Sequence, residues 1–452
     1  MSREKKYEID MCNGSIMDKL ISFALPLMLS GMLQLMFNAV DIVVVGRFSG
    51  SQSLAAVGAT TALIYLFTNL FIGISLGANV LAARYYAAGK HEEMSETVHT
   101  AMMFALISGI IMIFVGLFFS RLALEIMGTP SDVIDQATLY MRIYFLGMPF
   151  FMLYNYGAAI LRAVGDTKRP LIFLIISGVV NACLNMLLVI VFHLDVAGVA
   201  IATVTSQFIS CVLVIGCLYR TKSSYQLRFS RLKIQKEYLK PICQVGIPAG
   251  IQSTVINFSN ALLQSSVNSF GSTTMAGYTA ANNIFGFLYV SVNAITQACM
   301  SFTSQNYGLR KLKRMDKILI DCLILTVIVS LVLGGGVYLF GAEILRLYTE
   351  EAEVISCGIE IFAYTTVTYF LCGIMDLFPG ALRGMDRSTV PMILSVIGTV
   401  GTRIVWVFWL FPAHRSLAFL FISYPASWLI TIVMQVICFY FVTLRFNGRF
   451  QM

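Results

Sequence analysis

The second half of this chain of 452 residues repeats the first half at a constant offset of 221 residues. The pairs that carry the repeat are Tyr86 and Tyr307, Arg162 and Arg383, Pro170 and Pro391, Gly50 and Gly271, and Met94 and Met315. Apolar residues make up 58% of the sequence and charged residues 12%, whereas a soluble domain carries roughly 25% charge. The repeat therefore predicts two copies of one membrane-embedded bundle, joined head to tail.

Hydrophobic runs give the expected architecture. A helix needs about 20 apolar residues to cross the hydrocarbon core, and the chain supplies twelve such runs. We expect an all-α integral membrane protein with twelve transmembrane helices in two pseudo-symmetric six-helix bundles. The runs lie at 18–46, 54–83, 96–119, 137–163, 169–191 and 197–219, then at 238–268, 275–304, 317–341, 357–384, 389–411 and 417–443. The expected domains are an N-lobe (1–219), a basic cytoplasmic connector (220–237) and a C-lobe (238–452).

The basic residues predict the orientation, because loops that face the cytoplasm are enriched in Lys and Arg. With the N-terminus inside, 25 of the 31 Lys and Arg fall on the inner side. Both termini are therefore expected in the cytoplasm, and the net charge of +8 is explained by topology without a nucleic-acid partner. The polar start of the chain predicts no cleavable signal, so the first helix is expected to stay as an anchor.

Two repeated lobes can rock about a site between them, which favours a transporter over an enzyme. The chain has no Walker sequence for ATP, so transport is expected to use an ion gradient and no cofactor. The ten cysteines are scattered and are expected to be small core residues. An intramembrane enzyme is disfavoured because the four histidines lie in or near loops, far apart in sequence.

An ion-driven carrier needs a group inside the membrane that binds a proton or cation, and acidic residues there are rare and usually functional. Two acids lie well inside the expected spans, Asp41 and Asp376. Gln34, Asn38 and Asp41 have i, i+4 and i+7 spacing, which places them on one face of the first helix. Asp41 is therefore the stronger candidate, and Asp376 is a candidate for a second coupling or substrate-attracting group. The alternative for Asp376 is a structural ion pair with Arg403.

Polar residues expected at the same depth in the membrane as Asp41 are its candidate partners. The fifth helix has the same polarity as the first and carries Asn181 and Asn185 in its outer half, while the sixth helix carries Thr203 early on its return. One carboxyl, two amides and one hydroxyl could hold a proton on Asp41 or coordinate Na⁺. The alternative is that these groups only join helices by hydrogen bonds.

The substrate is expected in a cavity between the lobes, where aromatic, thioether and polar side chains suit a large organic cation. The candidate lining residues are Gln34, Phe37, Asn38, Met152, Tyr154, Asn155, Asn257, Tyr278, Asn282, Phe285 and Asp376.

Several segments together resemble the multidrug and toxic compound extrusion (MATE) family over nearly the whole chain. They are Pro26, Gln34 and Asp41 with Val45-Gly46-Arg47, Leu54-Ala55-Ala56-Val57-Gly58, Leu161-Arg162-Ala163 with Gly165-Asp166 and Pro170, the pair Asn181 and Asn185, and Ala381-Leu382-Arg383-Gly384. The resemblance implies a V-shaped, twelve-helix antiporter that exports drugs or organic cations in exchange for H⁺ or Na⁺. It also implies that Asp41 couples transport to the ion, together with Asn181, Asn185 and Thr203.

The resemblance has limits. Some members carry an acid where this chain has Asn185, and others carry one on the seventh helix, where this chain has only amides. A flippase for a lipid-linked saccharide remains the alternative, although it would favour a cavity rich in Arg and Lys to hold a diphosphate, and we expect no such lining apart from Arg142 and Arg403. We expect a monomer in the bacterial cytoplasmic (inner) membrane.

Overall fold

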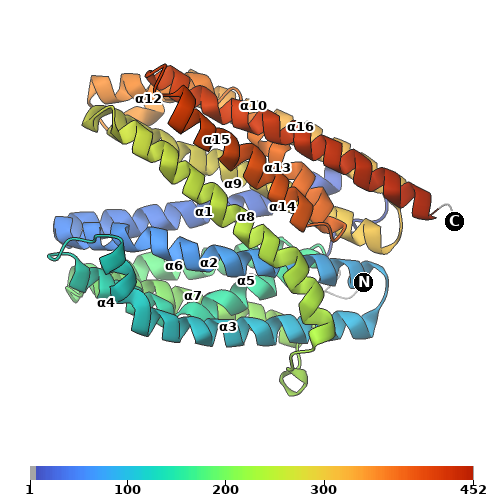
Figure 1. Cartoon of the computed structure of the whole chain (residues 1–452). Coiled ribbons are helices and arrows are strands. Elements are labelled where there is room, and N and C mark those ends of the chain that lie inside the picture. The colour runs from blue at the N-terminus through green and yellow to red at the C-terminus, as the bar shows by residue number, and fades with distance from the viewer. Residues whose placement is uncertain (1–6, 451–452) are drawn as a thin grey trace. The chain divides into compact units, whose positions relative to one another are not determined.

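The computed structural model describes residues 7–450, apart from the side chains of Ser51 and of residues 444–450. The described residues form helices joined by turns and loops (Figure 1). The first half contains α1 (Met17–Phe48), α2 (Gly50–Ala87), α3 (His91–Ile126), α4 (Ile134–Leu146), α5 (Met148–Ala163), α6 (Lys168–Asn185), η2 (Met186–Val191) and α7 (Asp195–Arg220). The second half contains α8 (Lys236–Asn268), α9 (Ser272–Gly308), α10 (Leu312–Leu339), α11 (Gly341–Arg346), α12 (Ala352–Thr365), α13 (Tyr369–Gly384), α14 (Thr389–Ser395), η4 (Val396–Gly401), α15 (Thr402–Val405), η5 (Trp406–Leu410) and α16 (Leu417–Phe450). A short 3-10 turn, η3 (Phe229–Arg231), lies between the two halves.

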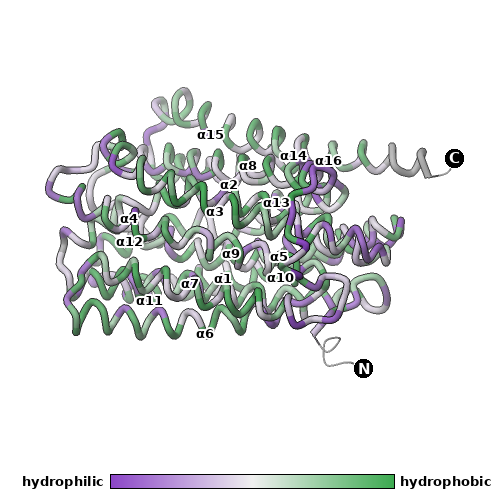
Figure 2. The backbone as a smooth tube through the Cα atoms, turned by 90° about the horizontal axis from the view of Figure 1, so that it is seen from below, coloured by the Kyte–Doolittle hydropathy of each residue, from purple (hydrophilic) through white to green (hydrophobic). Residues whose placement is uncertain are grey.

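The prediction of an all-α membrane fold is confirmed, and each of the twelve expected runs falls on a helix or on consecutive helices. Within the described residues, nine helical segments are long and apolar enough to cross a bilayer, and two bent helix pairs would raise the number to eleven if each pair forms one span. The bends are 48° between α4 and α5 and 50° between α12 and α13. The remaining run is α8, which is 33 residues long but more polar. Hydrophilic residues gather at the ends of the helices, as expected for spans (Figure 2).

Large apolar side chains are exposed along the sides of the helices. On α3, Phe114 is 56% and Phe118 72% exposed. In water, apolar surface of this extent would be unfavourable, but a lipid bilayer accommodates it without that penalty. The surface therefore matches a hydrocarbon environment.

The chain divides into two compact units. The first unit contains the residues up to Met11 and Leu29–Gly250, and the second contains Cys12–Met28 and Ile251–Met452. The first unit thus extends beyond the expected end of the N-lobe at 219, because it includes the first half of α8. In the same way, the start of α1, Met17–Met28, is part of the second unit.

Small residues allow close helix packing in the first unit. A Cβ atom at Gly77 of α2 would lie 2.0 Å from the carbonyl oxygen of Ile242 in α8, and one at Gly73 would lie 2.3 Å from the backbone nitrogen of Gly250. Such contacts are possible only for glycine, and small residues are the usual means of close packing between membrane helices. They explain why the start of α8 belongs to this unit.

Aromatic side chains fill much of the core of the second unit. Phe23 of α1 packs edge-on against Phe302 of α9, with ring centres 5.6 Å apart. Tyr369 of α13 stacks on Phe285 and meets Trp428 of α16 edge-on. The first contact joins α1 to α9, and the others join α9, α13 and α16 in one aromatic cluster.

The segment before α1 is held on the first unit. The Glu8 carboxylate accepts hydrogen bonds from the Tyr86 and Tyr225 hydroxyls, at 2.7 and 2.8 Å. Burial raises the pKa of Tyr225 to about 12, so its hydroxyl stays a donor at neutral pH. Gly165 has φ +94°, and a Cβ there would lie 2.5 Å from the Ile9 carbonyl oxygen. This contact gives the Gly165-Asp166 motif a structural reason.

Candidate functional site

Asp41, Asn181 and Asn185 meet inside the first unit. The Asn185 amide nitrogen donates to Asp41 Oδ1 and, at 3.2 Å, to Asn181 Oδ1. Both asparagines are buried, and Asp41 is partly buried. The three residues form a continuous polar cluster between α1 and α6.

Packing below the cluster sets the position of Asp41. The Phe37 ring lies directly against Gly178 of α6, where an added Cβ would come within 1.8 Å of the ring. Asp41 follows Phe37 by four residues and Asn185 follows Gly178 by seven, so both lie further along the same pair of facing helices. Asn185 ends α6, and the π-helical turn η2 begins at the next residue.

Two oxygens of the cluster have incomplete hydrogen bonding. Thr203 of α7 approaches the Asp41 carboxyl, but among the described residues neither its buried hydroxyl nor Asn185 Oδ1 has a hydrogen-bond partner at bonding distance. Unsatisfied buried polar atoms are costly and call for an explanation, such as a water or an ion. Together with Asp41, these groups are chemically able to exchange a proton or to bind a small hard cation.

The other candidates in the first unit lie in different surroundings. Gln34 and Asn38 are exposed on α1. Met152 is fully buried in the apolar core. The Tyr154 hydroxyl donates to the Pro170 carbonyl at 3.2 Å, and the Asn155 amide donates to the Phe151 carbonyl of its own helix at 2.8 Å. The side chains of Met152, Tyr154 and Asn155 thus have structural contacts within this unit.

The candidates in the second unit also separate into two groups. Asn257 and Asn282 are exposed. Tyr278 and Phe285 are buried in the aromatic core, 2% and 9% exposed, and the Tyr278 hydroxyl lies 3.2 Å from that of Tyr424. The exposed amides are therefore available to a ligand in this structure, and the two rings are not.

Asp376 lies partly buried on α13, and the basic group that acts on it is Arg383, seven residues further along the same helix. Arg383 Nη2 donates to Gln252 Oε1 at 2.6 Å, and Gln252 in turn donates to Ser395 Oγ at 3.2 Å. No ion pair joins Asp376 to Arg403 among the described residues. The expected alternative partner of Asp376 is thus engaged elsewhere.

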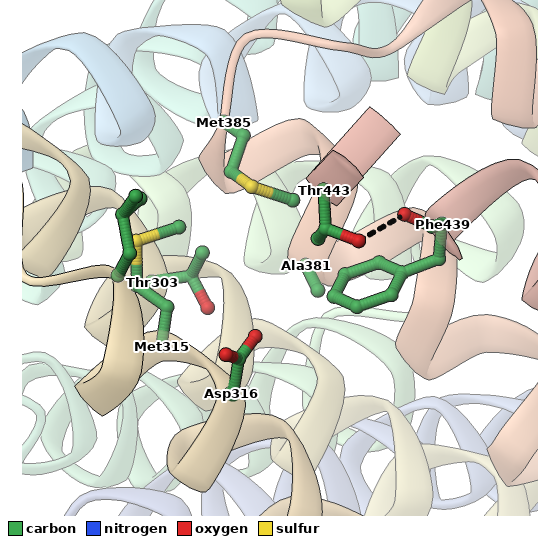
Figure 3. A pocket seen from close by; sticks show the side chains of 8 residues that line it. Thr303, Met315, Asp316, Ala381, Met385, Phe439 and Thr443 are labelled. Atoms are coloured by element: carbon green, nitrogen blue, oxygen red, sulfur yellow. Dashed lines mark hydrogen bonds between the residues drawn. The ribbon is translucent and has the colours of Figure 1, made fainter. Parts of the chain in front are cut away.

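A small pocket in the second unit contains none of the predicted residues. Figure 3 shows Asp316 and Thr303 facing it, with the Thr443 hydroxyl bonded to the Phe439 carbonyl at 2.9 Å. Its other lining residues are Leu312, Met315, Ala381 and Met385.

The sequence analysis missed a second buried polar cluster, around Arg403. Arg403 contacts Ser259, Asn260, Ser427 and the ring of Tyr424. The 221-residue offset was the signal that could have found it. Tyr424 corresponds to Thr203, and Arg403 corresponds to Ala182, the residue after Asn181. The Arg403 cluster therefore lies on the helices that correspond to α1, α6 and α7, although Asp41 itself corresponds to Leu262.

Known proteins resemble the chain over most of its length. It is 28% identical to the probable multidrug resistance protein YoeA of Bacillus subtilis over 423 residues, which cover 91% of each chain. It is 21% identical to the multidrug export protein MepA of Staphylococcus aureus, with 88% of this chain and 87% of MepA covered.

Solved structures share the fold. A multidrug resistance MATE family transporter of the MOP superfamily, in an outward-facing conformation, matches with a TM-score of 0.88 at 20% identity, and 98% of each chain is covered. A MATE structure in complex with MaL6 matches with a TM-score of 0.89 over the full length of both chains.

The MatE family model matches the chain twice, at residues 26–187 and 248–409, once in each half of the internal repeat. The Asp41 cluster lies within the first match except for Thr203, and the Arg403 cluster lies within the second except for Tyr424 and Ser427. With both halves matched by one model and the fold shared over its whole length, the chain belongs to the MatE family.

Proposed function

We propose that this chain is a multidrug antiporter that exports drug-like molecules or organic cations in exchange for protons or sodium, by alternating access. The observation that carries the proposal is the Asp41 cluster, with a membrane carboxyl bonded to Asn185 and two further oxygens unsatisfied. The names of YoeA and MepA support the substrate class. A flippase for a lipid-linked saccharide is less well supported, because this cluster has no basic side chain to hold a diphosphate.

The orientation of Asn185 favours a proton as the coupling ion. Its nitrogen points towards both Asp41 and Asn181, whereas a Na⁺ site needs oxygens that converge on one point. Sodium coordination would require the Asn185 amide to turn over. Protonation of Asp41 requires no such change.

The Asp41→Asn variant tests the proposal. We expect it to insert and fold but to lose ion-driven efflux, because an amide of the same shape cannot gain or lose a proton at neutral pH. Efflux of a cationic dye from proteoliposomes is measured under a pH gradient alone and then under a Na⁺ gradient alone. Asp132→Asn, at an exposed position outside the spans, is the matched control.

Full gradient-driven transport by Asp41→Asn would refute the coupling role. Transport by the native chain under a Na⁺ gradient but not under a pH gradient would replace the proton with sodium. We also propose that the protein works as a monomer in the bacterial cytoplasmic membrane with both termini inside. Protease protection of terminal tags in sealed vesicles tests that orientation.

A further inference from the structure

Arg403 is a buried cation without an acidic partner. Its side chain is 2% exposed, and the groups that act on it electrostatically are Tyr424, Cys372, Tyr278 and Tyr369. Among the described residues, no Asp or Glu pairs with it. A buried charge that is not paired is strongly unfavourable, and such charges normally have a counter-ion.

The neighbours of Arg403 hold it in place but do not neutralise it. Its Nη1 donates to Asn260 Oδ1 at 2.6 Å and to Ser259 Oγ at 3.4 Å, and its Nε donates to Ser427 Oγ at 3.4 Å. The guanidinium lies over the Tyr424 ring, 4.5 Å from its centre. These contacts use two of the three guanidinium nitrogens and fix the plane of the group.

Two hydrogen-bond donors of the Arg403 cluster remain available to a ligand. Among the described residues, none accepts a hydrogen bond from Arg403 Nη2, and none accepts one from the Asn260 amide nitrogen. Asn260 is oriented by Arg403, since its oxygen receives the Nη1 bond. An amide N–H and a guanidinium N–H next to a positive charge form the donor set that recognises a small anion.

We propose that Arg403, Asn260 and Ser259 form an anion site in the second unit, which takes a halide or the carboxylate of a bound molecule. It lies on α8, α15 and α16, the helices that correspond in the repeat to α1, α6 and α7 of the Asp41 cluster. The first set of helices, α1, α6 and α7, holds a carboxyl that can take up a cation, and the second set holds a guanidinium that takes an anion.

The three tryptophans of the chain provide a reporter for this site. Trp406, Trp409 and Trp428 are its only tryptophans, and the Trp428 ring packs against Tyr424 with ring centres 5.6 Å apart. The double substitution Trp406→Phe and Trp409→Phe leaves Trp428 as the single emitter. Chloride and acetate are titrated separately into the purified full-length protein. The ionic strength is kept constant by replacing a bulky sulfonate salt with the chloride or acetate salt.

We expect a saturable change in Trp428 emission with chloride, acetate or both. In Arg403→Gln the midpoint should rise by about tenfold or more, since the charged donor is lost. Arg403→Lys should give an intermediate value because the charge is kept and the planar fork is lost. Arg415→Gln removes an exposed arginine of the same unit and should leave the midpoint unchanged.

Asn260→Asp keeps the test decisive if Arg403→Gln does not fold. The new carboxylate would itself pair with Arg403, so the variant should be at least as heat-stable as the parent and should no longer respond to added anion. A saturable response to chloride identifies the ligand as a halide, and a saturable response to acetate identifies it as a carboxylate. A linear response to both anions in the parent, or an unchanged saturable response in Asn260→Asp, would overturn the site.

Discussion

The amide of Asn185 is hydrogen-bonded to the Asp41 carboxyl. The Asn185 nitrogen donates to Asp41, and a donor of this kind stabilises the ionised form of a carboxyl over the protonated form. If Asp41 carries the coupling proton, as proposed, this bond affects how readily the proton is released. The same bond fixes α1 on α6 at the last residue before η2.

Asn185→Ala should shift the pH profile of transport upward. Without the donor, Asp41 holds its proton more firmly, so release needs a higher pH. A hydrogen bond to a charged group contributes about 1.5 to 3 kcal/mol, which corresponds to a shift of about 1 to 2 pH units. Dye efflux measured across a range of pH provides the check.

The control for this profile is Asn155→Ala, because the Asn155 amide bonds only the Phe151 carbonyl of its own helix. Its profile should match that of the native chain. An unshifted profile in Asn185→Ala would mean that the amide does not act on the proton of Asp41.

At this scale the sequence predicted one polar cluster and missed the other. Asp41, Asn181 and Asn185 could be grouped because acids and paired amides are unusual in apolar helices. The ligands of Arg403 include Ser259 and Ser427, and serine is common in membrane helices as a packing residue. Arg403 itself stood out as a basic residue inside a span, but residue type gave no signal for its serine partners.

Helix packing depends on a few glycines that hydropathy does not reveal. Gly73 and Gly77 of α2 contact the backbone of α8 directly. Span lengths could be predicted from the sequence, but the bends between α4 and α5 and between α12 and α13 could not, because an apolar run fixes length and not direction.

Gly77→Leu should destabilise the first unit. A side chain there meets the Ile242 carbonyl, and backbone cannot move aside as a flexible side chain can. Overpacking costs typically 1 to 3 kcal/mol or more, so we expect the melting temperature in detergent to fall by about 5 °C. Gly216→Leu is the control, since nothing lies within 4 Å of a Cβ at Gly216.

A melting temperature of Gly77→Leu equal to that of Gly216→Leu would contradict the close contact between α2 and α8. Light scattering during the same scan separates unfolding from aggregation.

The whole molecule is two repeats that exchange parts of helices. The first unit includes the start of α8, and the second includes Cys12–Met28 from the start of the chain. The 221-residue repeat predicted two copies of one bundle, but it could not predict this exchange, because hydropathy does not identify the bundle that a half-helix packs on.

Cutting the chain after Ser224, in the loop between α7 and α8, tests this organisation. The fragment 1–224 lacks part of the first unit, and 225–452 lacks part of the second. Each fragment expressed alone should therefore be degraded, whereas the two expressed together should assemble and transport dye. A fragment 225–452 that alone was as heat-stable as the intact chain would rule out the exchange.

Each half of the chain contains a π-helical turn at a corresponding place in the repeat. η2 spans Met186–Val191 and η5 spans Trp406–Leu410, and the two overlap when the first is shifted by the 221-residue offset. A π-turn is rare in proteins, so its presence at overlapping places in both halves shows that the two lobes share an unusual local helix geometry. Asp41 and Arg403 lie outside these turns, in α1 and α15. The two lobes therefore keep one distorted helix shape while their buried charges are opposite in sign.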